Sequence, residues 1–256
     1  MRIKNITKRV ILPGVIVLAG IFGLMTGCTG NKPFADNTPP DRFSYVSDTT
    51  GMPFEIHFQR GQYHNHPLMV FWIEDLEGNY VKTIYIAQSI GKGIFRYGAK
   101  DEGHWEPGEI QRPASLPYWA HKRGVKNDLG NYIPSPKMPM PDAVTGPTPK
   151  RNFILKFNTG KVVSDQFVLK MEINQTWDFN EYWTNGKFPG NQEYITSCQP
   201  ALVYEARINM TDGVQEYIMK AVGHSHYDGS DGSLTTDLST ITTALDIARE
   251  VKVVFP

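Results

Sequence analysis

Four of the seven histidines occur in two His-x-His pairs, His64-Asn-His66 and His224-Ser-His226. On a β-strand, residues i and i+2 point to the same face about 6–7 Å apart, so each pair presents two imidazoles together. Imidazole is a common ligand of Zn and Cu. The favoured interpretation is that these histidines are polar residues at strand ends beside turns, in which case we expect no cofactor. The alternative is that the four histidines bind Zn or Cu, which requires the two pairs to lie at one end of neighbouring antiparallel strands.

A second pattern, Asp142-Ala-Val-Thr-Gly-Pro-Thr148, resembles the motif that flavin transferases read when they attach FMN to a threonine through a phosphodiester. The resemblance implies that Thr148 is the flavin acceptor and that Asp142 and Gly146 belong to the recognition turn. Pro147 stands where the motif prefers alanine. The alternative is a turn in which the side chains of Asp142 and Thr145 hydrogen-bond the backbone.

Tryptophans in the loops form a third group, because an indole ring can stack on a sugar or on a protein partner. This predicted ligand platform comprises Trp105, Trp119, Trp177 and Trp183. The alternative is that aromatic rings in long loops cover the core beneath them. A platform requires rings that are adjacent, exposed and coplanar.

The segment Asp228-Gly-Ser-Asp231-Gly-Ser, followed by Asp237, has the composition of a calcium loop. Its spacing differs from that of an EF-hand, and Ser239 stands where the bidentate glutamate would be. Tight turns with Asx hydrogen bonds are therefore the favoured interpretation.

Catalytic motifs are scarce in this sequence. It contains no Gly-x-Ser-x-Gly elbow, no His-Glu-x-x-His and no Gly-rich phosphate loop. Cys198 is a single thiol in a strand-like context, which is typical of a buried structural cysteine. We therefore assign no catalytic residue, although a glycosidase that uses two carboxylates remains an alternative.

The elements that position these residues are mostly strands, and a hairpin at 68–86 is the most strongly marked. Residues 68–73 are six consecutive apolar residues, typical of a strand covered on both faces. Gly78-Asn79 predicts a turn, and residues 80–86 a returning strand. Burial of each apolar side chain in the first run contributes about 1.5–3 kcal/mol. We therefore expect this hairpin at the centre of a sheet.

Most other strand signals alternate with period two, which places apolar side chains on one face and polar ones on the other. These strands are expected at 54–58, 153–157, 167–173, 202–208, 216–222 and 251–255. About eight strands and little helix predict an all-β fold, an antiparallel β-sandwich. Short helices are expected at 115–124, with a capping Ser and a terminal Gly, and at 240–248. Two long excursions, 87–150 and 174–194, interrupt the strands and are typical of functional or edge-covering segments.

The N-terminus has a basic start and a short apolar run at 10–25, which predicts a secretory signal rather than a membrane span. Leu24-Met-Thr-Gly-Cys28 resembles the bacterial lipobox, which implies cleavage before Cys28 and acylation of its thiol. We predict a signal peptide at 1–27, a flexible tether at 28–41 and one domain with the long excursion at 42–256. The mature chain would carry a net charge of about −4, without the basic stripe that nucleic-acid binding requires.

Four segments together are similar to one family: FWIEDLEGNYVKT at 71–83, SLPYW at 115–119, DAVTGPTP at 142–149 and GHSHYDGSDGSLTTDLSTITTA at 223–244. They resemble the bacterial predicted periplasmic proteins grouped as domain of unknown function 2271, over most of 68–255. The resemblance implies an immunoglobulin-like or fibronectin-like sandwich, similar to the β domain of the flagellar hook-capping protein. It brings no established activity.

Together these features predict a non-enzymatic, lipid-anchored protein of the bacterial cell envelope, facing the periplasm or the cell surface. Its partners are expected to be the lipid bilayer, through acylated Cys28, and an envelope protein or glycan bound by the excursions. Two alternatives stay open. One is an envelope metal-binding protein that uses the paired histidines in metal or redox traffic, and the other is a carbohydrate-binding or carbohydrate-active protein.

Overall fold

The computed structural model describes residues 36, 38–45, 50–161 and 164–255. The predicted signal peptide, the lipidation site Cys28 and most of the predicted tether lie outside the described residues. In the described part of the chain, no helix combines the length and the apolar composition needed to cross a bilayer.

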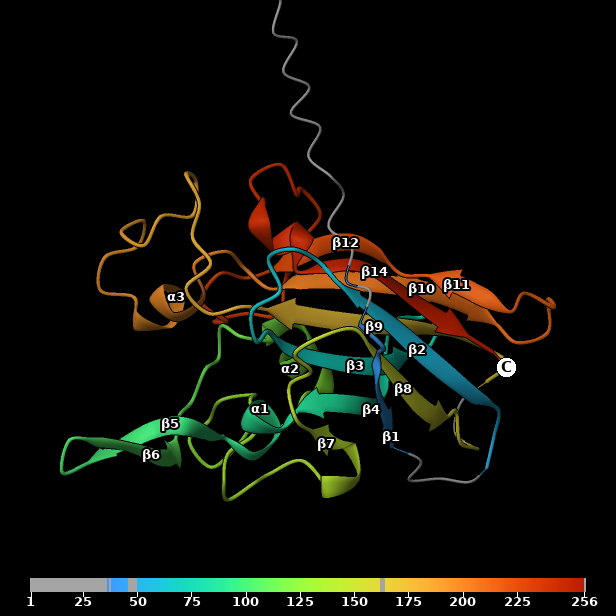
Figure 1. Ribbon diagram of the computed structural model, residues 1–256, viewed down its shortest axis with the longest axis horizontal. Coiled ribbons are helices and arrows are strands. Elements are labelled where there is room, and N and C mark those ends of the chain that lie inside the picture. The colour runs from blue at the N-terminus through green and yellow to red at the C-terminus, as the bar shows by residue number, and fades with distance from the viewer. Residues whose placement is uncertain (1–35, 37, 46–49, 162–163, 256) are drawn as a thin grey trace, which may run out of the picture. The chain divides into compact units, whose positions relative to one another are not determined.

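The described chain is mostly β, with two large sheets and a separate hairpin (Figure 1). The seven-stranded sheet has the order β13-β12-β10-β9-β3-β4-β7, and the five-stranded sheet has the order β1-β8-β2-β14-β11. The strands of the larger sheet are β3 (Leu68–Glu74), β4 (Tyr80–Ala87), β7 (Thr145–Gly146), β9 (Gln166–Asn174), β10 (Leu202–Asn209), β12 (Lys220–Ser225) and β13 (Leu234–Thr235). Those of the smaller sheet are β1 (Asp41–Ser44), β2 (Pro53–Arg60), β8 (Phe153–Asn158), β11 (Glu216–Ile218) and β14 (Ala248–Val254). The hairpin joins β5 (Ile94–Asp101) to β6 (His104–Glu109).

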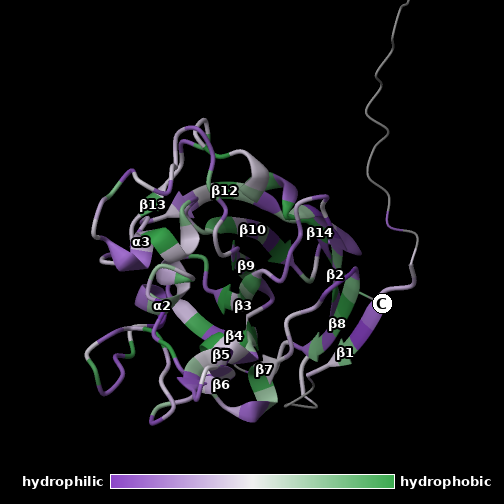
Figure 2. Cartoon of the chain, turned by 60° about the vertical axis from the view of Figure 1, so that its left-hand side comes forward, coloured by the Kyte–Doolittle hydropathy of each residue, from purple (hydrophilic) through white to green (hydrophobic). Residues whose placement is uncertain are grey.

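The predicted hairpin at 68–86 is confirmed as β3 and β4, and β3 lies inside the larger sheet between β9 and β4. All seven β3 residues are buried. Its alternate residues join two cores. Phe71 packs between the two sheets with Phe54 and Phe58 of β2, and Trp72 packs in a second core with Trp119. Figure 2 shows hydrophobic residues along these central strands. The second core exists because the excursion at 87–150 covers the outer face of the larger sheet.

The alternating strands lie where the sequence predicts them, but the sheets are mixed rather than purely antiparallel. β1 pairs with β8 in parallel, and β4 pairs with β7 in parallel. Both parallel pairs are at sheet edges. The edge strands β1 and β7 come from parts of the chain that are distant in sequence from their partners, β8 and β4. The predicted strand at 216–222 divides at Met219, so that β11 belongs to the smaller sheet and β12 to the larger one. Sequence alternation does not reveal any of these pairings.

The helices are short: α1 (Gln88–Lys92), α2 (Pro117–Arg123), α3 (Gln192–Ser197) and the 3₁₀ turns η1 (Asp142–Val144) and η2 (Thr243–Asp246). The predicted helix at 115–124 is α2, which ends at Gly124 with a φ of 71°, a conformation that glycine adopts at little cost. Ser115 is not its cap, because the N-cap is Leu116 and no side chain caps the helix. The predicted helix at 240–248 is mostly wrong. Only η2 forms there, and the chain enters β14 at Ala248.

Candidate functional site

The excursion at 87–150 is attached to the larger sheet through a buried carboxylate, Glu172. Glu172 lies on β9, is 0% exposed, and accepts hydrogen bonds from the backbone N–H groups of Tyr118 at 3.2 Å and Trp119 at 2.8 Å. Burial raises the pKa of Glu172 to about 8, against the lowering effect of these hydrogen bonds. The Trp119 indole also donates to Thr83 Oγ1 on β4 at 2.9 Å. The excursion is therefore docked by specific polar contacts as well as by apolar packing.

Both excursions contribute to a cavity of about 500 Å³, which we call the Arg112 cavity. Three cationic side chains line it, Arg96, Arg112 and Lys150. All of its lining residues are described ones, and none of them is acidic. The other lining residues are His66, Leu68, Ser89, Phe95, Tyr97, Thr148 and Thr176. A volume of this size is in the range of small-molecule sites.

Arg112 is the unusual group in this wall. Its Nε and Nη1 atoms are buried without a hydrogen-bond partner among the described residues. The guanidinium carbon lies 4.8 Å from the ring centroid of Phe95, a cation–π contact. Burial lowers the pKa of Arg112, while the nearby charge of Glu193 acts to raise it. Buried donors without partners cost about 1–3 kcal/mol each, more when charged, so an anion in the cavity beside this side chain would offset part of that cost.

Backbone strain accompanies the same cavity. Four non-glycine residues in the described chain have positive φ, and His66, with a φ of 52°, lines the cavity. A second, Trp177, with a φ of 61°, directly follows the lining residue Thr176. Such conformations cost about 1–3 kcal/mol each and cluster at functional sites.

The predicted flavin acceptor Thr148 lies on the wall of the Arg112 cavity. Asp142 is exposed in η1 and forms an ion pair with Lys92 at 2.5 Å. Thr145 Oγ1 donates to the Asp142 carbonyl at 3.4 Å, so the Thr145 part of the suggested turn is present, whereas the Asp142 carboxylate pairs with Lys92. Gly146 lies in β7, where a Cβ would be 1.7 Å from Tyr45 Oη, and only glycine fits. The role of Thr148 as a flavin acceptor stays a prediction.

The paired histidines do not form one ligand set. His224 pairs with Leu202, and through β10 and β9 it is in register with Met69 on β3. Three strand spacings, roughly 14 Å, therefore separate it from the strand that follows His64 and His66. The condition for a shared site, that β3 and β12 are neighbours, is not met, since β9 and β10 lie between them. Among the described residues, no group of three or more His, Cys, Asp or Glu side chains could hold a metal ion.

Each histidine pair has its own surroundings. His64 is 8% exposed, contacts the ring of Phe58 and has no hydrogen-bond partner for its ring nitrogens among the described residues. Burial lowers the pKa of His64 to about 4. His226 contacts Asp228 at 2.8 Å, and His224 lies against the ring of Trp183. These side chains are therefore used mainly in packing and turns.

The four predicted platform tryptophans divide into two buried and two exposed rings. Trp119 is 0% and Trp183 is 7% exposed, and each indole N–H has a threonine partner. These two rings cover cores and cannot present a face to a ligand. Trp105 and Trp177 are 59% and 61% exposed but belong to the β5–β6 hairpin and to the second excursion. Within the described chain, no aromatic pair joins Trp105 or Trp177 to another ring.

A second cavity, of about 460 Å³, lies beside α2 and α3 and is lined by two carboxylates, Glu193 and Asp228. Burial raises the pKa of Glu193, and Asp228 adds to this. Burial also acts to raise the pKa of Asp228, but hydrogen bonds from Ser230 and Asn191 leave it lowered. A pair with opposite shifts is what general acid–base catalysis uses.

This second cavity offers no free aromatic face for a sugar in the part of the chain that is described. The ring of Tyr132, which lines it, lies 4.2 Å from that of His121 and 5.0 Å from Lys126 Nζ. Its acidic turn is closed on itself, because Asp228 and Asp231 accept the N–H groups of Ser230 and Ser233. The predicted Asx turns are thus confirmed.

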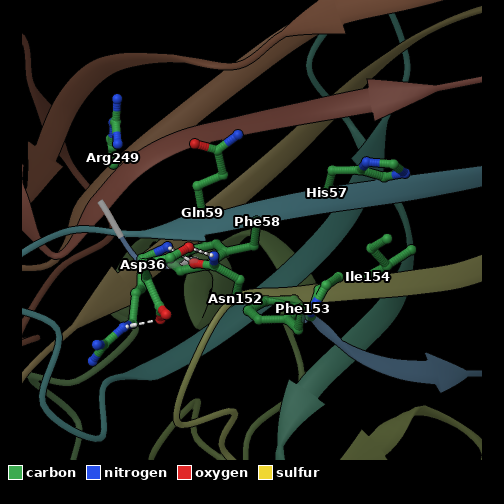
Figure 3. A pocket seen from close by; sticks show the side chains of 10 residues that line it. Asp36, His57, Phe58, Gln59, Asn152, Phe153, Ile154 and Arg249 are labelled. Atoms are coloured by element: carbon green, nitrogen blue, oxygen red, sulfur yellow. Dashed lines mark hydrogen bonds and ion pairs between the residues drawn. The ribbon is translucent and has the colours of Figure 1, made fainter. Parts of the chain in front are cut away.

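A third cavity, of about 310 Å³, lies on the smaller sheet where residue 36 approaches β2 and β8 (Figure 3). Its polar groups satisfy one another. Arg60 Nε donates to Asp36 Oδ2 at 2.6 Å, and Asn152 Nδ2 donates to the Asp36 carbonyl at 3.1 Å. The Arg60 N–H donates to Asn152 Oδ1 at 2.9 Å. We interpret this as a clamp that holds the segment before β1, which the sequence predicted to be part of the tether.

No protein-family model, curated protein or solved structure matches this chain. Sequence reasoning missed Arg112, which lines the cavity, and Glu172, which attaches the excursion to the larger sheet. Glu172 was expected on a polar face of its strand, and nothing in that pattern shows that residues 117–119 cover it. Arg112 stands in a Pro-rich loop, where an arginine is ordinary. The only useful signal was the length of the excursion itself.

Proposed function

We propose that the protein is a non-enzymatic, lipid-anchored protein of the cell envelope that binds a small ligand in the Arg112 cavity. The observation that supports this best is a cavity of about 500 Å³ with three cations in its wall. It is bounded by residues of both excursions, the segments whose length is typical of functional or edge-covering loops. The anchor at Cys28, the immunoglobulin-like form of the sandwich and the relation to domain of unknown function 2271 belong to the same proposal and are supported by the sequence patterns.

The test is to release bound small molecules from the protein purified from membranes of its native host. Ser89 lies on α1 in the cavity wall, so Ser89→Trp should fill the cavity. Ser233 is exposed in a turn of the β12–β13 loop, and Ser233→Trp is the matched control. A stoichiometric small molecule should be released from the wild type and the control and be lost from Ser89→Trp. A wild-type protein that releases none contradicts the proposal.

A second candidate, covalent flavin on Thr148, is favoured by the position of that residue on the cavity wall. A phosphodiester at Thr148 would bring its negative charge into a cavity with three cationic side chains. The preceding residues 142 and 143 are exposed, so an attaching enzyme has access to the motif. We expect the Thr148 peptide from the native host to carry the mass of FMN, and Thr148→Ala to lose it. Thr176→Ala, a cavity threonine outside the motif, should keep it, and an unmodified Thr148 peptide rejects this candidate.

A further inference from the structure

Arg112 differs in its hydrogen bonds from two other partly buried arginines, Arg60 and Arg123. Arg123 keeps one unpartnered buried nitrogen, Nε, but its other two guanidinium nitrogens donate to Met140 Sδ and the Val125 carbonyl. Arg60 donates to the Asp36 carboxylate in the clamp at 2.6 Å. Arg112 has no carboxylate within 4.0 Å among the described residues, and two of its guanidinium nitrogens have no hydrogen-bond partner there. The charge of this guanidinium is therefore not compensated by a paired carboxylate of the described chain, and an anion that enters the cavity beside it would compensate it.

The surroundings of Arg112 define the chemistry of that acceptor. The Phe95 ring lies against the guanidinium, with its centroid 4.8 Å from the guanidinium carbon. Arg96 and Lys150 add two more positive charges to the same wall. A group with at least two negative charges and several oxygens matches this set better than a single carboxylate. Phosphoryl groups have both properties, and arginine binds them through two parallel hydrogen bonds.

We infer that the Arg112 cavity is an oxyanion site in which Arg112 binds the phosphoryl group of the ligand, with Lys150 and Arg96 as supporting cations. This inference rests on the proposed function and names the ligand class for the same cavity. Phe95 and Tyr97 lie in the same wall, and Tyr97 is 59% exposed. The moiety to which the phosphoryl group is attached would therefore lie beside the rings of Phe95 and Tyr97.

The test uses the full-length protein, after mass spectrometry has shown that Thr148 is unmodified. The protein is titrated with inorganic phosphate and with pyrophosphate, and binding is followed by calorimetry and ³¹P NMR. A parallel titration with acetate measures the binding of a carboxylate. We expect saturable phosphate binding that weakens about tenfold to a hundredfold in Arg112→Gln, as loss of a charge-assisted pair implies. Arg207→Gln is the matched control, because Arg207 is exposed on β10 outside the cavity. It should bind phosphate as the wild type does.

If Arg112→Gln does not fold, Lys150→Gln gives the same test from an exposed position. Absence of phosphate and pyrophosphate binding to the wild type overturns the inference, as does binding that neither variant weakens. Acetate bound more tightly than phosphate also overturns it. A molecule released from the native protein that lacks a phosphoryl group overturns the inference but leaves the proposed function standing, so the two failures are distinguishable.

Discussion

Replacement of Glu172 by Gln should change how the stability of this protein depends on pH. The folded-state pKa of Glu172 is raised to about 8 from an ordinary value of 4.5, so the folded protein holds a proton that the unfolded chain releases. Stability from this group is therefore present below pH 4.5 and is lost as pH rises toward 8. His64, with a pKa lowered to about 4, acts in the opposite sense between pH 4 and 6.5. The window from pH 6.5 to 8 therefore separates the effect of Glu172 from that of His64.

In that window the wild type should lose about 2 kcal/mol of unfolding free energy through Glu172. Glu172→Gln lacks this loss, but its amide cannot accept both N–H groups of residues 118 and 119 as well as a carboxyl does. We expect it to be about 1–3 kcal/mol less stable than the wild type at pH 6.5 and to approach it by pH 8. Urea unfolding at four pH values measures this, with Glu77→Gln in an exposed turn as control. Parallel curves for the wild type and Glu172→Gln would refute the reasoning.

Three other predictions follow from single contacts. Gly146→Ala should destabilise the fold by about 1–3 kcal/mol, because its Cβ would meet Tyr45 Oη. Urea unfolding should show no such loss for Gly186→Ala, which has open space around it. Equal losses in the two variants would contradict the packing argument. His64→Phe should remove a loss of up to about 3 kcal/mol as pH falls from 6.5 to 4, because the buried neutral ring no longer has to be protonated; acid unfolding curves that coincide with the wild type would exclude this. Cys28→Ser should abolish incorporation of labelled palmitate and release the protein from pelleted membranes. Cys198→Ser, at a buried thiol, should do neither. A Cys28→Ser protein that still carries labelled palmitate would contradict the anchor proposal.

Local patterns predicted the parts of the fold whose environment is set by near neighbours. The apolar run at 68–73 has no polar position to expose, so it had to lie inside a sheet, and it does. Gly124 ends α2 because a left-handed residue closes the helix whatever packs beside it. Alternation at 54–58 and 202–208 marked the faces correctly.

What the patterns could not predict is which face is covered and by what. Lys170 and Glu172 occupy the polar positions of β9, yet both are buried, because the excursion at 87–150 docks on that face. The parallel edge strands β1 and β7 depend on contacts with residues far away in sequence, which propensity does not encode. The Arg112 cavity combines six separate segments, so no single stretch carries its signature.

The passage of one uninterrupted stretch, β11 to β12, from the smaller sheet to the larger has a mechanical consequence. Met219 sits at the crossing, 4% exposed, and its N–H donates to the Val251 carbonyl at 2.8 Å. The two sheets cannot separate without breaking the contacts of Met219, so we expect them to unfold cooperatively. Amide protons on both sides of Met219 should then exchange with deuterium at the free energy of global unfolding.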